Sequence, residues 1–318
     1  MTVQAPRRST RYRGRRPQFR SLSDLVGHTP LVRLQRIARH LTPAVELYAK
    51  LEWFNPSGSV KDRPALGIIQ AAEAAGDLAP GRTLLDSTSG NMGIAYATLA
   101  RVRGYRVHLM LPDNISPERT TILRSLGAEL EFTPGLEGSD GAAAAARALA
   151  AAQPGKYFYA NQYDNPANWL AHYRTTGPEI IQQTRGRVTH LVAGLGTSGT
   201  LLGTGRALTD YNPRVQLVAV QPESPMHGIE GLKHMASARA PGIYVPALVD
   251  RTLAVSTEDA YETTRRLAAD EGLLAGVSAG AAACAALRLA DTLAEGVVVV
   301  ILPDAGYKYL SESFWKEA

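Results

Sequence analysis

Lys61 stands at the expected start of a helix, a position that does not suit a positive charge. A strand is expected over 45–52, and the loop NPSGSVKDR (55–63) leads into a helix that closes at Gly76. A lone lysine is usually a solvated surface charge, but at a helix N-terminus its charge opposes the helix dipole. One use for such an amine is a Schiff base with a carbonyl group.

A second segment with chemical potential is the glycine- and hydroxyl-rich loop GLGTSGT (194–200), between a predicted strand and a predicted helix. Glycines let the backbone approach an anion, and a helix N-terminus presents N–H groups to it. Hydroxyl groups of Thr197, Ser198 and Thr200 can add hydrogen bonds to phosphate oxygens. The spacing also matches G-x-G-x-x-G, with Glu223 after the following strand, so a nicotinamide-dependent dehydrogenase is an alternative. A tight turn without a ligand is the other alternative.

A third loop, STSGNMG (87–93), brings hydroxyls, backbone N–H groups and an amide to another strand–helix junction. This combination suits a carboxylate or a phenolate oxygen. An ordinary helix cap followed by glycine packing is the simpler interpretation.

The elements that must position these loops alternate between strand and helix along nearly the whole chain. Strands rich in Val, Ile and Leu that alternate with helices predict parallel sheets with helices on both faces. We expect two such α/β units, with the segment 166–184 crossing between them. The strands are predicted over 83–88, 105–112, 128–133, 188–194, 215–222 and 297–303, and the helices over 89–104, 115–127, 196–210, 256–272 and 275–293, with a further helix in the Ala-rich run 142–152.

Composition excludes several kinds of site. The 318 residues include one cysteine, Cys284, so no intrachain disulfide and no cysteine-based zinc site can form. A buried free thiol and the lack of an export signal favour the cytoplasm. No apolar stretch reaches the length of a membrane span without interruption.

The positive charge is concentrated in one segment. Residues 1–20 hold seven arginines and no acid, so subtracting seven from the net charge of +5 leaves the remainder near −2. We expect a disordered basic tail over 1–20; an anion- or RNA-binding arm and an organellar transit peptide are alternatives. The body has no basic stripe, so no nucleic-acid partner is expected.

The three loops and several further blocks resemble the β-family of pyridoxal-phosphate enzymes, typified by O-acetylserine sulfhydrylase and cystathionine β-synthase. The similarity runs in the family's order over roughly residues 21–313. The blocks that carry it are Gly27–Leu31, Asn55–Arg63, Thr88–Asn91, Asn161–Gln162 with Asn165–Asn168, Gly196–Thr200, Gly276–Gly280 and Pro303–Gly306.

This resemblance implies a fold and a cofactor. The fold is the tryptophan synthase β-like fold of type II pyridoxal-phosphate enzymes, with two open, twisted, mostly parallel sheets. Residues 21–50 and 165–318 would form the larger domain that binds the cofactor's phosphate. Residues 51–164 would form a smaller, mobile domain with the loop for the substrate carboxylate.

The resemblance also implies a role for each site residue. Lys61 would hold pyridoxal 5'-phosphate as a Schiff base and later carry a proton to and from the α-carbon. Asn91 would contact the ring oxygen, and Ser278 the pyridine nitrogen. The phosphate would lie on Gly196, Thr197, Ser198, Gly199 and Thr200, and the substrate carboxylate on Thr88, Ser89, Gly90, Met92 and Gln162.

The residue types favour β-replacement. A hydroxyl such as Ser278 does not keep the pyridine nitrogen protonated as an aspartate would, so the ring is a weaker electron sink. Charge formed at the α-carbon is then relieved by loss of a leaving group from the β-carbon, which gives an aminoacrylate and ping-pong kinetics. The expected reaction is formation of L-cysteine from O-acetyl-L-serine and sulfide. O-Phosphoserine, another nucleophile, a protein thiocarboxylate from a sulfur-carrier protein, and a dehydratase-like elimination are alternatives.

Met92 departs from the family, which usually has threonine there, so one hydrogen bond to the carboxylate is lost. The segment 225–235 lacks the arginine that phosphoserine-using relatives carry, which favours the acetyl ester. An anionic group could still be met by one of four residues whose types favour the surface, namely Arg119, His227, Lys233 and His234. A homodimer is expected from the resemblance alone.

Overall fold

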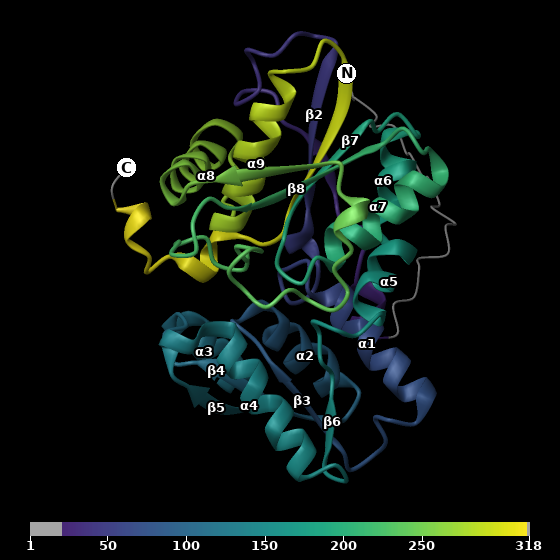
Figure 1. Ribbon diagram of the computed structural model, residues 1–318, viewed down its shortest axis with the longest axis vertical. Coiled ribbons are helices and arrows are strands. Elements are labelled where there is room, and N and C mark those ends of the chain that lie inside the picture. Colours follow the sequence, from purple (N-terminus) through teal and green to yellow (C-terminus); the bar gives the residue numbers. More distant parts are fainter. Residues whose placement is uncertain (1–20, 317–318) are drawn as a thin grey trace, which may run out of the picture.

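The computed structural model describes residues 21–316, which fold into two lobes, each built on its own sheet (Figure 1). The larger sheet has the strand order β1-β2-β10-β7-β8-β9 and the smaller one β5-β4-β3-β6. Apart from β1, which runs antiparallel to β2, every pair of neighbouring strands is parallel. The predicted basic tail over 1–20 lies outside the described residues.

The strands of the larger sheet come from both ends of the described chain. They are β1 (Leu31–Arg33), β2 (Val45–Leu51), β7 (His190–Gly194), β8 (Gln216–Pro222), β9 (Arg251–Val255) and β10 (Gly296–Leu302). The strands of the smaller sheet are consecutive in sequence. They are β3 (Thr83–Ser87), β4 (Arg106–Pro112), β5 (Glu129–Thr133) and β6 (Tyr157–Tyr159).

Helices cover both faces of both sheets. In the larger lobe they are α6 (Thr176–Thr184), α7 (Gly199–Tyr211), α8 (Thr257–Glu271) and α9 (Val277–Ala290). In the smaller lobe they are α2 (Asn91–Val102), α3 (Pro117–Ser125) and α4 (Gly138–Ala152), while α1 (Asp62–Ala75) and α5 (Ala167–Arg174) lie at the junction of the lobes (Figure 1).

The position of strand β10 between two cores explains why its sequence is continuously apolar. Val298, Val300 and Leu302 join the core that contains α9, whereas Val299 and Ile301 join the core on the opposite face, which contains residues of α6 and α7. Alternate side chains of a strand point to opposite faces, so a strand covered on both sides needs apolar residues at every position.

The predicted α/β architecture with two mostly parallel sheets is confirmed, and each predicted strand and helix is present within a few residues of its predicted bounds. Helix α1 closes at Gly76, whose φ of 78° is left-handed and therefore suits glycine. The sequence did not predict β6 or β9, which have three and five residues. Within the described residues, no helix is long and apolar enough to cross a membrane.

Candidate active site

A cavity of about 700 Å³ lies between the lobes and is lined by residues of both. It opens at the carboxyl ends of the strands, where open α/β sheets bind ligands. The three loops singled out from the sequence meet here. Two of the predicted site residues, Gly90 and Gly199, do not line the cavity. The predicted residues that do line it are Lys61, Thr88, Ser89, Asn91, Met92, Gln162, Gly196, Thr197, Ser198, Thr200 and Ser278.

Lys61 immediately precedes α1, at the end of a turn held at both ends. The N–H of Val60 donates to the carbonyl oxygen of Pro303 (2.8 Å), and Asp62 accepts a hydrogen bond from the N–H of Ser57 (2.7 Å). Burial lowers the pKa of the Lys61 amine, and the Asp304 carboxylate opposes that shift. A lowered pKa increases the fraction of neutral amine, the form that attacks an aldehyde.

The glycine loop leads from β7 into the N-terminus of α7 and has no room for larger residues. A Cβ on Gly196 would lie 2.5 Å from the carbonyl oxygen of Gly231, and one on Gly199 would lie 2.0 Å from Oδ1 of Asn168. Ser198 adopts a left-handed backbone conformation with φ of 69°, and its buried hydroxyl has no partner among the described residues. An unpartnered hydroxyl beside helix N–H groups is suited to a phosphate.

His172 of α5 links this loop to α6 through two hydroxyl groups. Its Nε2 lies 3.2 Å from Oγ1 of Thr200, and its Nδ1 lies 2.8 Å from Oγ1 of Thr176. Burial, followed by the nearby Arg63 charge, lowers the pKa of His172 to about 3, so the imidazole is neutral. A neutral ring can hold two hydroxyls without adding a charge to the loop.

The loop after β3 turns into α2 through Thr88. The Thr88 Oγ1 accepts hydrogen bonds from the N–H groups of Gly90 (2.9 Å) and Gly93 (3.1 Å). Because its oxygen is used as an acceptor, its hydroxyl hydrogen remains to be donated to a ligand such as a carboxylate. Gly90 has φ of 142°, a left-handed conformation that suits glycine. Since glycine has no side chain, its predicted contact with the carboxylate could be made only by its backbone.

Gln162 approaches the same loop from the segment after β6. Its Nε2 donates to the carbonyl oxygen of Ser87 (2.6 Å), and its backbone N–H donates to the buried Asp86 carboxylate (3.3 Å). Burial raises the pKa of Asp86 to about 7. Met92, the departure from the family pattern, is 2% exposed and packs in the core of the smaller lobe.

The Asn91 side chain is held at both ends. Its Nδ2 donates to Oδ2 of Asp304 (2.7 Å), and its Oδ1 accepts from Nζ of Lys308 (2.7 Å). Lys308 also donates to the carbonyl oxygens of Ser57 (3.2 Å) and Gly58 (3.1 Å), in the turn that carries Lys61. The sequence did not single out Lys308, although it lies two residues after the closing block Pro303–Gly306.

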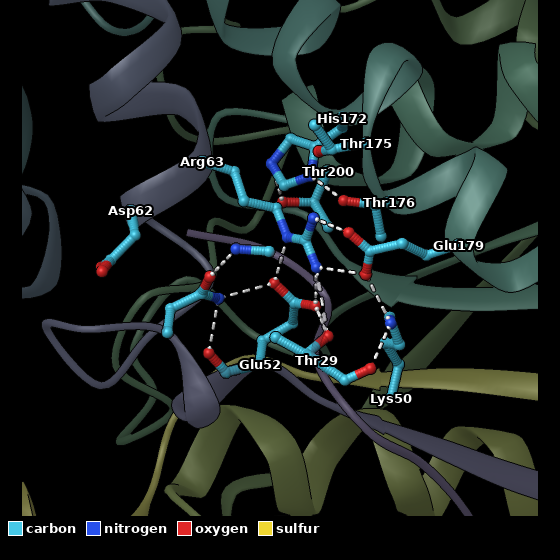
Figure 2. A network of polar contacts seen from close by, with 12 residues as sticks. Thr29, Lys50, Glu52, Asp62, Arg63, His172, Thr175, Thr176, Glu179 and Thr200 are labelled. Carbon is cyan, nitrogen blue, oxygen red and sulfur yellow. Dashed lines mark hydrogen bonds and ion pairs between the residues drawn. The ribbon is translucent and has the colours of Figure 1, made fainter. Parts of the chain in front are cut away.

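A buried network of charges surrounds Arg63 in the first turn of α1 and is drawn in Figure 2. The Arg63 guanidinium donates to Glu52 through Nε (2.7 Å) and Nη2 (2.9 Å), and to Glu179 through Nη1 (2.7 Å) and Nη2 (2.8 Å). Lys50 donates to Glu179 (2.7 Å), and Thr29 donates to Glu52 (2.7 Å). Two cations and two carboxylates thus compensate each other at the junction of the lobes.

These contacts explain the charge states in the network. Burial alone would raise the pKa of Glu52, but the Arg63 guanidinium lowers it overall. In the same way, burial is outweighed at Glu179, whose pKa falls to about 2 because Arg63 and Lys50 donate to it. The network therefore holds the first turn of α1, and with it Lys61, against the larger lobe.

Two of the four residues whose types favoured the surface are buried in the structure. Arg119 is 3% exposed and Lys233 is 8% exposed. Arg119 pairs with Glu230, and Lys233 pairs with Asp140 at 2.6 Å. His227 and His234 also line the cavity.

The sequence of this chain matches known proteins over most of its length. The model of the family "Pyridoxal-phosphate dependent enzyme" matches residues 22–304. The chain is 49% identical to cysteine synthase of Aquifex aeolicus over 302 residues, which cover 93% of this chain and 92% of that protein. This chain is a pyridoxal-phosphate-dependent enzyme of the cysteine synthase family.

Other cysteine synthase relatives agree with this assignment. The crystal structure of the cysteine synthase (OASS) of Entamoeba histolytica superposes with a TM-score of 0.90 at 35% identity, covering 99% of this chain and 94% of that one. O-Ureido-L-serine synthase of Streptomyces lavendulae is 43% identical over 306 residues, covering 93% of this chain and 92% of that protein. The dehydrogenase alternative has no support in these findings.

The cysteine synthase site fits the cofactor that defines the family. The unpartnered hydroxyl of Ser198 and the N-terminus of α7 would hold the phosphate, and the amine of Lys61 would hold the aldehyde carbon. Ser278 lies in the first turn of α9, is 6% exposed and lines the cavity, so a hydroxyl rather than a carboxylate would face the pyridine nitrogen.

Proposed function

We propose that this enzyme forms L-cysteine from O-acetyl-L-serine and sulfide by β-replacement. In the overall reaction a carbon–sulfur bond forms at the β-carbon, and the carbon–oxygen bond breaks so that acetate leaves with the electron pair. The supporting observation is one cavity that unites Lys61, a phosphate loop, a carboxylate loop and a serine at the start of α9. Pyridoxal phosphate, when bound, supplies the electron sink that makes the α-proton acidic.

The chain's own residues do the remaining work. Thr88 donates its hydroxyl hydrogen to the substrate carboxylate, and Gln162 supplies an amide beside it. Lys61, with its pKa lowered by burial, takes the proton from the α-carbon and returns it to the product. Asn91 is fixed by Asp304 and Lys308, so it presents its remaining N–H in one orientation.

The enclosure of the cavity favours this reaction over elimination. Residues of the β8–β9 loop (223–250) pair with both α3 and α4, and all four partners line the cavity. A substrate held beneath this loop is shielded from water. Water would otherwise convert the dehydrated amino acid that is left after loss of acetate into pyruvate and ammonia. The mobility of the smaller domain, the homodimer, the cytoplasmic location and a sulfur-carrier donor stay predictions.

The test is turnover of the purified holoenzyme with O-acetyl-L-serine and sulfide, assayed for cysteine. We expect cysteine and acetate in equal amounts, ping-pong kinetics, and no product from Lys61→Ala. Parallel reactions with serine, phosphoserine, homocysteine and hydroxyurea, whose addition would give O-ureido-L-serine, define the nucleophile and the leaving group. Faster turnover with hydroxyurea than with sulfide, or pyruvate as the main product, would contradict the proposal.

A further inference from the structure

The wall of the cavity carries more negative than positive permanent charge. Apart from the lysine that would hold the cofactor, the described residues contribute two permanent cations, Arg119 and Lys233, and four carboxylates, Glu137, Asp140, Glu230 and Glu312. Four minus two leaves an excess of two carboxylates when the histidines are neutral. Such a wall repels an anionic substituent.

Of the two wall cations, Arg119 is the one that contacts the carboxylate loop. Its Nη1 donates to the carbonyl oxygen of Ser89 (3.2 Å), and its guanidinium lies 4.6 Å from the ring centre of Tyr309. The same Nη1 forms an ion pair with Glu230 of the β8–β9 loop. Its charge is therefore already compensated at the place where it could otherwise attract the substrate.

Lys233 is compensated in the same way, by a carboxylate in the first turn of α4. Its Nζ lies 2.6 Å from Oδ1 of Asp140 and 5.0 Å from the ring centre of Tyr163. Asp140 also accepts the backbone N–H of Arg239 (3.1 Å). Although burial alone would raise it, the pKa of Asp140 is lowered because Lys233 donates to it, so this carboxylate is charged at neutral pH.

The carboxylates of the wall already affect one another. Burial, and then the Glu230 carboxylate, raises the pKa of Glu312 above its usual value, although Arg119 acts in the opposite direction. A phosphoserine side chain carries about two negative charges at neutral pH, whereas an acetyl ester carries none. A phosphate beside this wall would be repelled by its carboxylates, and both cations already have a carboxylate partner.

From this arrangement we infer that Glu230, together with Asp140, determines substrate choice by neutralising Arg119 and Lys233, so that the cavity accepts activated serines with an uncharged β-substituent and rejects phosphoserine. The inference rests on the proposed β-replacement and adds to it the chemical class of the leaving group. Glu230 acts through Arg119, and it is a specificity-determining residue rather than a catalytic one.

The experiment compares kcat/KM for O-phospho-L-serine with kcat/KM for O-acetyl-L-serine, each with sulfide, in the holoenzyme. Glu230→Gln and Asp140→Asn each remove one carboxylate and leave a side chain of the same shape. Glu137→Gln is the matched control, because Glu137 lies on the same wall and the described residues include no ion-pair partner for it.

We expect the phosphoserine-to-acetylserine ratio to rise about tenfold or more in Glu230→Gln and in Asp140→Asn. The control also removes a wall carboxylate but frees no cation, so the ratio should rise less than in either variant, by about twofold at most. The gain should shrink as salt rises toward 1 M, because the phosphate enters from solvent and salt screens its attraction to the freed cation. A loss of packing alone would lower both kcat/KM values and would not give a salt-dependent ratio.

The outcomes separate this inference from the function on which it rests. If the wild-type enzyme makes no cysteine from O-acetylserine, the proposed function fails. If it does, and both variants keep the wild-type ratio, the inference alone fails. A wild-type preference for phosphoserine would also overturn it, because Arg119 or Lys233 would then bind phosphate despite its carboxylate partner.

Discussion

Replacing Arg63 with methionine tests the buried network of charges that surrounds it. The change removes five hydrogen bonds from the guanidinium: two to Glu52, two to Glu179 and one to Thr29 at 3.1 Å. Lys50 still compensates Glu179 at 2.7 Å, but Glu52, whose side chain is 0% exposed, loses the only cation that contacts it within the described residues.

An uncompensated buried charge of this kind destabilises a protein by about 3–5 kcal/mol. The control is Arg187→Met, because Arg187 pairs with Glu46 at 2.5 Å while 51% of its side chain is exposed. An exposed ion pair contributes about 0–1 kcal/mol. We therefore expect the free energy of unfolding to fall by at least about 2 kcal/mol more for Arg63→Met than for Arg187→Met.

The assay is urea unfolding of the apoprotein, followed by circular dichroism and by tryptophan fluorescence. The double variant Arg63→Met with Glu52→Gln should recover about 1–3 kcal/mol, because it removes the orphaned charge. Equal losses for the two single variants, or no recovery in the double variant, would refute the argument from buried charge.

Three further variants test the loops and the core beneath them. Gly196→Ala places a Cβ 2.5 Å from the backbone oxygen of Gly231. The affinity for the cofactor should therefore fall at least about tenfold in a titration of the apoprotein. An unchanged affinity would contradict the close approach. Burial raises the pKa of Asp86 from 3.8 to about 7, so the stability that its protonated form contributes is complete below about pH 4 and is lost as the pH rises through 7. Asp86→Asn should therefore flatten the fall in unfolding free energy between pH 5.5 and pH 8. An unaltered pH dependence would count against burial as the cause. Met92→Thr restores a hydroxyl beside the carboxylate loop, so KM for the amino-acid substrate should fall about 3–10-fold at similar kcat, whereas a higher KM would show that the methionine itself favours binding.

The fold was predictable because its strongest signals are local. Buried parallel strands are continuously apolar, and the helices between them begin and end with caps such as Ser256 and Gly272 of α8. The short strands β6 and β9 carry too few residues for a periodic pattern, and both lie next to one partner only, at a sheet edge. Pairing with β3 and β8, which are distant in sequence, defines them.

The site was predictable where a single loop holds the chemistry, and less so where distant segments meet. The glycines and hydroxyls of 194–200 stand together in sequence. Glu179, by contrast, contacts Arg63 across 116 positions, and Lys308 contacts Asn91 across 217. No local pattern marks such partners, and the residue types of Arg119 and Lys233 favoured the surface although both are buried.

The most direct test of the account is to reduce the purified holoenzyme with borohydride, digest it and locate the phosphopyridoxyl group by mass spectrometry. We expect one labelled peptide, with the label on the side-chain nitrogen of Lys61. Label on another lysine such as Lys308, or none in protein prepared with pyridoxal phosphate, would contradict it.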